Sequence, residues 1–215
     1  MSGGRSAMLR RVRAALADVP ADERPDDVPV PRTYRRSHAG EDVVGLFADR
    51  LADYGAHVSR TSDPATAIAA AVTRRSVGSL IVPDGLPIGW LRPGPWRVLR
   101  DDPPLPVAAL DGASGVLSTA VAGIAVTGTL VLDAGPGQGR RALTLLPDYH
   151  LCVVPAARIV GDVPEVLARL APDAPLTFVS GPSATSDIEL DRVEGVHGPR
   201  VLEVIIVDDG KEPPA

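Results

Sequence analysis

The chain of 215 residues is poor in cysteine and carries no recognisable metal-ligand pattern. Cys152 is the only cysteine, so no internal disulfide can form, and a single thiolate cannot hold an iron–sulfur cluster. The four histidines are scattered along the chain without the spacing of zinc ligands. The sequence therefore supplies no redox centre of its own, and we expect no cofactor in this chain.

Aromatic residues are equally scarce, at 3%, and the net charge is -5. A nucleic-acid surface normally needs a basic balance, and single-strand binding needs aromatic stacking platforms, so both classes are excluded. Long hydrophobic runs are also missing, and no signal-peptide pattern precedes the first helical pattern. We therefore expect no membrane span and a cytoplasmic location.

Hydrophobic residues, at 45%, are numerous enough for the core of one α/β domain. Residues 7–16 repeat apolar side chains at helical spacing beside four arginines, and residues 20–31 are a linker rich in proline and aspartate. The helix lacks the bulky anchors of a membrane-surface helix, which favours a docking arm. The sequence thus predicts an N-terminal helical arm and linker over 1–40 and an α/β domain over 41–215.

The remaining patterns alternate between strands and helices. Near-continuous apolar strands separated by helical patterns indicate a sheet that is covered on both faces, which is a three-layer α/β fold. Cys152 lies in one of these apolar runs, where a buried structural thiol is expected. The predicted strands are 57–60, 78–83, 96–99, 121–132, 151–154, 175–180 and 201–207, and the predicted helices are 42–54, 65–73 and 164–170.

A glycine-rich turn follows the strand that ends at Leu132. Gly135, Gly137 and Gly139 allow positive φ and leave backbone amides uncovered, and Arg140 follows with a second arginine beside it. Such a corner can hold a phosphate or a carboxylate. The same spacing also fits a hairpin turn with two solvated arginines.

A second candidate segment follows the strand at 175–180. A glycine turn with hydroxyls between a strand end and a helix start is a common ligand site in open α/β sheets. The alternative is that these side chains satisfy local backbone donors. The candidates in this segment are Gly181, Ser183, Thr185, Asp187 and Glu189.

His197 lies in a glycine-rich loop further along the chain, between Gly195 and Gly198. A histidine in such a loop can orient a carboxylate or transfer protons. More often such a residue packs or bonds a carbonyl.

Four segments together resemble the LUD domain family, the lactate-utilisation family, and within it the protein C (YkgG) group. They are GIAVTGT at 123–129, Arg140 with LPDYH at 146–150, GPSATSDIE at 181–189 and VEGVHGP at 193–199. The resemblance implies a fold similar to the sugar-phosphate isomerase and coenzyme A transferase (NagB/RpiA) type. It also implies a role in oxidising L-lactate to pyruvate, with partner proteins that carry the iron–sulfur clusters. It adds Thr127, Gly128 and Thr129 to the candidate site.

One position departs from the family pattern, which usually reads Ala-Glu-Thr-Gly-Thr. This chain has Val126 where the glutamate would fall. Valine cannot act as a base, a nucleophile or a hydrogen-bond acceptor. The departure weakens the case for a catalytic role, so the sequence leaves open whether the protein is an enzyme.

Three hypotheses follow, in order of preference. The first is a non-redox subunit of a lactate-oxidising system that works with iron–sulfur partner proteins and holds a small anionic ligand. The second is an enzyme acting on a phosphorylated or CoA-linked metabolite, supported mainly by fold analogy. The third is a structural or regulatory module without a ligand.

Overall fold

The computed structural model describes residues 3–20, 22–24, 27, 30–31, 35, 37–185, 193–194 and 198–208. The chain divides into two compact units, Met1–Arg35 and Arg36–Ala215. The first unit contains helix α1 (Gly3–Ala15), which covers most of the predicted N-terminal helix. None of the helices in the described ranges is both long and apolar enough to cross a bilayer.

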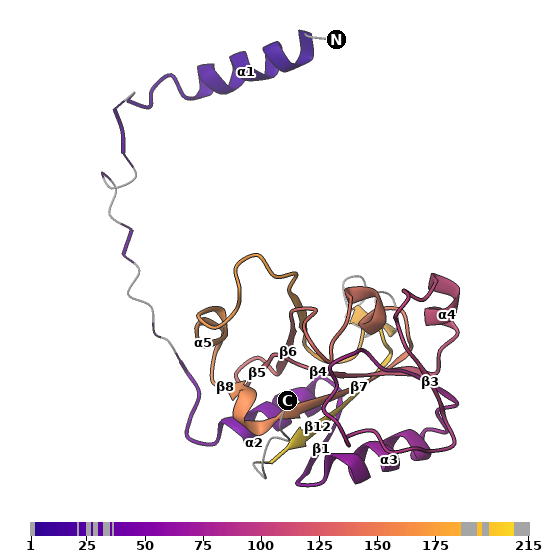
Figure 1. Ribbon diagram of the computed structural model, residues 1–215. Coiled ribbons are helices and arrows are strands. Elements are labelled where there is room, and N and C mark those ends of the chain that lie inside the picture. Colours follow the sequence, from indigo (N-terminus) through magenta and orange to yellow (C-terminus); the bar gives the residue numbers. More distant parts are fainter. Residues whose placement is uncertain are drawn as a thin grey trace. The chain divides into compact units, whose positions relative to one another are not determined.

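The second unit is a mixed α/β domain, and this prediction of the fold class is confirmed (Figure 1). Its helices are α2 (Val43–Asp53), α3 (Pro64–Arg74), α4 (Val107–Asp111) and α5 (Val163–Leu167), with 3-10 helices η2 (Arg141–Thr144) and η3 (Ala156–Arg158). Its strands are β1 (His57–Thr61), β2 (Ser79–Ile81), β3 (Arg97–Leu99), β4 (Gly115–Thr119), β5 (Ala122–Ile124), β6 (Thr129–Leu132), β7 (Tyr149–Pro155), β8 (Ile159–Val160), β9 (Thr177–Val179), β10 (Ala184–Thr185), β11 (Val193–Glu194) and β12 (Val201–Val207).

The main sheet has six strands in the order β1-β12-β7-β4-β2-β3. Every neighbouring pair in it is parallel. Parallel sheets need cover on both faces, and side chains alternate between the faces along each strand. On β12, for example, Val204 and Ile206 face one core cluster, whereas Ile205 faces another.

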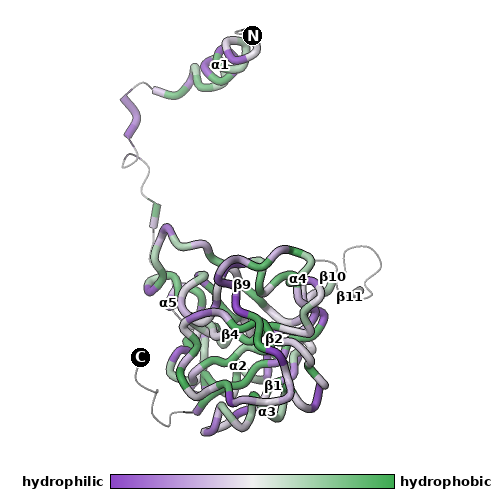
Figure 2. The backbone as a smooth tube through the Cα atoms, turned by 45° about the vertical axis from the view of Figure 1, so that its right-hand side comes forward, coloured by the Kyte–Doolittle hydropathy of each residue, from purple (hydrophilic) through white to green (hydrophobic). Residues whose placement is uncertain are grey.

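Helix α3 covers one face of this sheet, and α2 covers the other. Ile68 and Val72 of α3 pack with Ile205 and with two buried tryptophans, Trp90 and Trp96. Hydrophobic stretches of the chain run through the interior of the unit (Figure 2).

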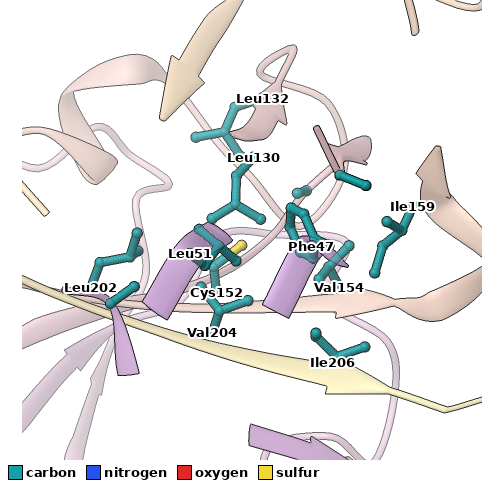
Figure 3. Packing of buried hydrophobic residues seen from close by; sticks show 13 residues of the cluster. Phe47, Leu51, Leu130, Leu132, Cys152, Val154, Ile159, Leu202, Val204 and Ile206 are labelled. Atoms are coloured by element: carbon teal, nitrogen blue, oxygen red, sulfur yellow. The ribbon is translucent and has the colours of Figure 1, made fainter. Parts of the chain in front are cut away.

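The cover on the α2 face also includes a strand. Phe47 and Leu51 of α2 pack with Leu130 of β6 and with Cys152 and Val204 of the main sheet (Figure 3). Cys152 is buried, as the sequence predicts. The third layer is therefore part helix and part sheet, because β6 belongs to a second, smaller sheet in the order β8-β5-β6-β9.

This smaller sheet corrects one prediction. The apolar run 121–132 is not one strand but the antiparallel hairpin of β5 and β6. The turn between them is closed by the Gly128 amide, which donates to the Ala125 carbonyl, and Gly128 has φ +55°. The apolar side chains of the run are buried on both sides of the turn, so hydrophobicity alone does not mark it.

Local capping fixes two of the predicted helices. Asp42 accepts a hydrogen bond from the Gly45 amide at the start of α2, and Asp63 does the same for Thr66 at the start of α3, where Pro64 occupies the first turn. Strand β4 and helix α4 were not predicted, because the segment before them is rich in proline and the strand contains two polar residues, Ser118 and Thr119.

Candidate functional site

A cavity of about 290 Å³ lies beside the start of strands β7 and β12. We call it the His150 pocket. It is bounded by η2 on one side and by the segment that follows β9 on the other. Its lining residues are Arg141, Thr144, Leu145, His150, Thr177, Phe178, Val179, Ser180, Gly181, Pro182, Ser183, Ala184, Gly198, Pro199 and Leu202.

The pocket lies at the amino ends of two main-sheet strands, which differs from the expected position. The sequence suggested a site between the end of the strand at 175–180 and the start of a helix, at the usual ligand edge of an open α/β sheet. Strand β9 instead belongs to the smaller sheet, pairing with β6. The segment after β9 therefore meets the start of β7 rather than a carboxyl edge of the main sheet.

His150 is the polar group buried most deeply in this pocket, with 1% of its surface exposed. Its Nε2 atom lies 2.7 Å from Ser118 Oγ on the adjacent strand β4. Burial lowers the pKa of the imidazole to about 4, so His150 is neutral at neutral pH. A neutral imidazole offers one donor and one acceptor.

A chain of three hydroxyls connects the β5–β6 hairpin to the pocket. Thr127 Oγ1 lies 2.7 Å from Thr129 Oγ1, which in turn lies 2.7 Å from Ser180 Oγ. Ser180 lines the pocket. The structure thus brings the predicted residues Thr127 and Thr129 together with the predicted segment around Gly181.

At two glycines of the candidate site, Gly128 and Gly181, close contacts with α2 or with Tyr54 directly after it leave no room for a side chain. Gly128 has positive φ, and a Cβ there would lie 2.7 Å from the Arg50 Cβ. Gly181 has φ +89°, and a Cβ there would lie 2.6 Å from the Tyr54 Cβ. Both glycines therefore allow close packing, which explains them without a ligand. Val126 is half-buried beside them, and its amide donates to the Gly161 carbonyl.

The two adjacent arginines have different environments. Arg140 donates from Nε and Nη2 to the Asp101 carboxylate, at 2.7 and 3.0 Å, and from Nη2 to the Leu105 carbonyl. Arg141 is exposed and lines the His150 pocket. The expectation that the Arg140 guanidinium stands ready for a ligand is therefore corrected, because an internal carboxylate already occupies its fork.

The glycine turn also differs from the expected anion corner. The amides of Gly135 and Gly137 donate to Asp133 and to the Asp84 carbonyl, and the Gly139 amide donates to the Gly135 carbonyl. These amides hold the loop together and are not free for an anion. Gly139 lines a separate hollow whose charged lining residues are Asp84 and Asp101, and acidic residues disfavour an anion there.

Several predicted site residues are not placed by the structure. Asp187, Glu189 and His197, and the helix predicted to begin near Ser186, lie outside the described residues. Thr185 belongs to strand β10, and Ser183 lines the pocket and donates its amide to the Pro199 carbonyl. Within the described ranges, no three histidine, cysteine, aspartate or glutamate side chains cluster closely enough to hold a metal ion.

Sequence reasoning missed the partnership of His150 with Ser118 and the position of Arg141. His150 stands in the motif LPDYH at 146–150, but a histidine in an apolar strand is more often a core residue. His150 reaches Ser118 because of the register of β4 against β7, which pairs Val116 with His150 and Ser118 with Cys152. That register is not visible in the sequence.

The fold and the pocket define a class: a parallel α/β domain extended by a hairpin sheet, with a small, partly apolar pocket. A model of the LUD domain matches residues 109–207, which span the hairpin and β12. The chain is 46% identical to "Lactate utilization protein C" of Deinococcus radiodurans, over 93% of each protein. The chain therefore belongs to the LUD domain family.

Other relatives agree with this assignment. The "Uncharacterized protein YkgG" of Escherichia coli is 35% identical over 40% of this chain and 41% of that protein. A crystal structure of a DUF162 family protein from Deinococcus radiodurans is 40% identical and superposes with a TM-score of 0.65. The superposition covers 77% of this chain and 96% of the solved chain.

Proposed function

We propose that this protein is a non-redox subunit of an L-lactate utilisation system that oxidises lactate to pyruvate in the cytoplasm. The observation that carries the proposal is the 46% identity, over 93% of both chains, to a relative named lactate utilization protein C. Identity at this level along the whole chain supports a shared role more strongly than a shared fold does.

The redox centres belong to partner proteins in this proposal. The single cysteine of the chain cannot hold an iron–sulfur cluster. Lactate oxidation releases two electrons, which partner proteins with iron–sulfur clusters would accept. The role of this chain is then to bind a ligand and to assemble with those partners.

The N-terminal helix offers one means of assembly. Met8 and Val12 of α1, and Leu16 directly after its end, follow one another at intervals of four residues, the spacing of one side of a helix. Arginines at positions 5, 10, 11 and 13 accompany this apolar stripe. We propose residues 1–40 as the docking arm and residues 41–215 as the ligand-binding domain.

The alternative, an enzyme for a phosphorylated or CoA-linked metabolite, has less support. Ligand pockets for drug-sized molecules enclose roughly 300 to 1,000 Å³. The His150 pocket, at about 290 Å³, lies at the lower end of that range, so it is small for CoA. Arg140, the candidate phosphate contact, is bound to Asp101.

The test is lactate-dependent dye reduction in extracts of the host, with and without the gene. We expect the rate to be lost in the deletion strain and restored when the purified full chain is added. An unchanged rate in the deletion strain would remove the pathway assignment. A melting-temperature screen with phosphates, nucleotides and CoA compounds would then test the alternative, because a ligand that binds the native state raises the melting temperature.

A further inference from the structure

The His150 pocket combines one cation, one buried neutral imidazole and an apolar wall. The exposed Arg141, the buried His150 and the apolar side chains of Leu145, Phe178 and Leu202 all line it. None of the salt bridges found among the described residues involves Arg141. An arginine without an internal carboxylate partner is well suited to bind a carboxylate ligand through two parallel hydrogen bonds.

The second ring nitrogen of His150, Nδ1, indicates that the ligand has a polar group besides its carboxylate. Nε2 is engaged with Ser118, whereas Nδ1 has no hydrogen-bond partner in the described part of the chain. Among the described residues, no fully buried side-chain nitrogen or oxygen lacks a partner. His150 lines the pocket, so Nδ1 is the ring nitrogen left for a ligand.

We propose that the His150 pocket binds a small 2-hydroxy or 2-oxo monocarboxylate, with the carboxylate on Arg141, the C2 oxygen on His150 Nδ1 and the short alkyl group against the apolar wall. The choice of L-lactate and pyruvate among such acids follows from the proposed function. Arg141 is the one arginine among the lining residues, which favours a monoanion over a phosphorylated ligand.

The Ser118–His150 pair allows both oxidation states of the acid to bind. When Ser118 donates to Nε2, the neutral ring carries its proton on Nδ1 and can donate to a 2-oxo group. When Nε2 donates to Ser118, Nδ1 is an acceptor for a 2-hydroxyl proton. The exchange moves one proton between ring nitrogens and changes no net charge, so a fully buried imidazole can accommodate it.

The pocket therefore suits a protein that must bind both a 2-hydroxy acid and the 2-oxo acid derived from it. No bond of the acid is broken by these residues in the proposal. His150 and Arg141 bind and orient the ligand, and the electrons leave through the partners.

The test is isothermal titration of the purified full chain with L-lactate, pyruvate and propionate, which has the same carbon skeleton but no C2 oxygen. We expect lactate and pyruvate to bind at least about 10-fold more tightly than propionate, because a site built for a ligand oxygen rejects the analogue that lacks it. Arg141→Gln should weaken lactate and pyruvate about 10-fold or more. Arg97→Gln, at an exposed arginine of edge strand β3, should leave binding unchanged.

His150→Asn tests the second contact. If this variant folds, its preference for lactate over propionate should fall to less than about 3-fold. If it does not fold, Arg141→Gln still tests the proposal, because the Arg141 side chain is exposed and its replacement should leave the fold intact. The absence of lactate and pyruvate binding to the wild-type chain, equal affinity for propionate, or full binding by Arg141→Gln would each overturn the inference.

The two proposals fail separately. If added wild-type protein restores lactate oxidation but the purified chain binds none of the three acids, the proposed function stands and the ligand site is wrong. If the purified chain binds lactate but its deletion leaves oxidation unchanged, the site stands and the pathway role is wrong.

Discussion

His150 Nε2 and Ser118 Oγ lie 2.7 Å apart across two parallel strands, although 32 residues separate them in the chain. The histidine is fully buried and neutral, and its pKa is lowered to about 4 by burial. An unfolded histidine has a pKa near 6.5. Between these values the unfolded chain binds a proton that the folded chain excludes, so folding stability rises with pH over this range.

We therefore expect the neutral His150 to make the free energy of unfolding up to about 3 kcal/mol larger above pH 6.5 than at pH 4. This stability is lost progressively as the pH falls from 6.5 toward 4. Urea unfolding between pH 4 and 7.5 measures it. Because carboxylates also titrate in this range, the comparison is with His150→Asn, whose stability should fall less steeply with acidification. Parallel curves for the two proteins would contradict the assignment.

A buried carboxylate, Glu203, joins the end of α3 to the main sheet. The Glu203 carboxylate accepts hydrogen bonds from Arg74, from Arg75 Nε at 3.0 Å and from the Tyr149 hydroxyl at 3.0 Å. Burial, together with the Glu203 charge, raises the pKa of Tyr149, which keeps its hydroxyl protonated. The buried carboxylate thus has three donors, of which the Tyr149 hydroxyl is buried, whereas the Arg74 side chain is 61% exposed.

Glu203→Ala should lower the free energy of unfolding by about 2 kcal/mol or more, because it leaves the buried Tyr149 hydroxyl without an acceptor and removes the buried acceptor of both arginines. The matched control is Asp148→Ala, which removes the exposed Arg200–Asp148 pair at 2.6 Å. Exposed pairs contribute about 0 to 1 kcal/mol, so the control should change little. Chemical denaturation of both variants decides it, and equal losses would refute the buried carboxylate as a stabilising element.

The β5–β6 turn depends on Gly128. A Cβ at this position would lie 2.7 Å from the Arg50 Cβ and 2.9 Å from its carbonyl carbon, and φ is +55°. Gly128→Ala should therefore cost about 3 kcal/mol, from the strained backbone together with the clash. Gly89→Ala is the control, because Gly89 has φ +87° but open space around it, and it should cost about 1 kcal/mol. A loss at Gly128 no larger than at Gly89 would show that α2 does not pack against the turn.

Cys152 should not react in the native protein. It is fully buried on main-sheet strand β7, facing α2 and the smaller sheet, and burial raises the pKa of its thiol to about 12. A chromogenic disulfide reagent should therefore detect no thiol in the folded chain and one after denaturation. Rapid reaction in the native state would place the residue at an accessible position and contradict the packing in Figure 3.

Local sequence signals account for much of the fold. Strand and helix patterns located α2, α3, β7 and β12 to within a few residues, because capping aspartates and apolar periodicity act over a few neighbouring positions. The same signals missed β4, whose two polar residues are buried in the centre of the sheet. The specific likeness to the NagB/RpiA fold stays a prediction.

The candidate site was only partly predictable. The hydroxyls at Thr127 and Thr129 and the segment around Gly181 do meet, through Ser180. The sequence favours Arg140, which stands in the family-like motif. The structure places Arg141, the next residue, at the pocket instead. Sequence gives no sign that Asp101, 39 residues earlier, reaches Arg140.

The sequence by itself determined that this is an α/β chain of the LUD family with a single cysteine, because composition, periodicity and motif order are properties of the chain. Only the tertiary structure decided that residues 121–132 fold back as a hairpin and that Arg141 and His150 share one pocket. These outcomes depend on strand register and on which side chains the folded interior pairs, and such contacts between distant residues leave no pattern in local sequence.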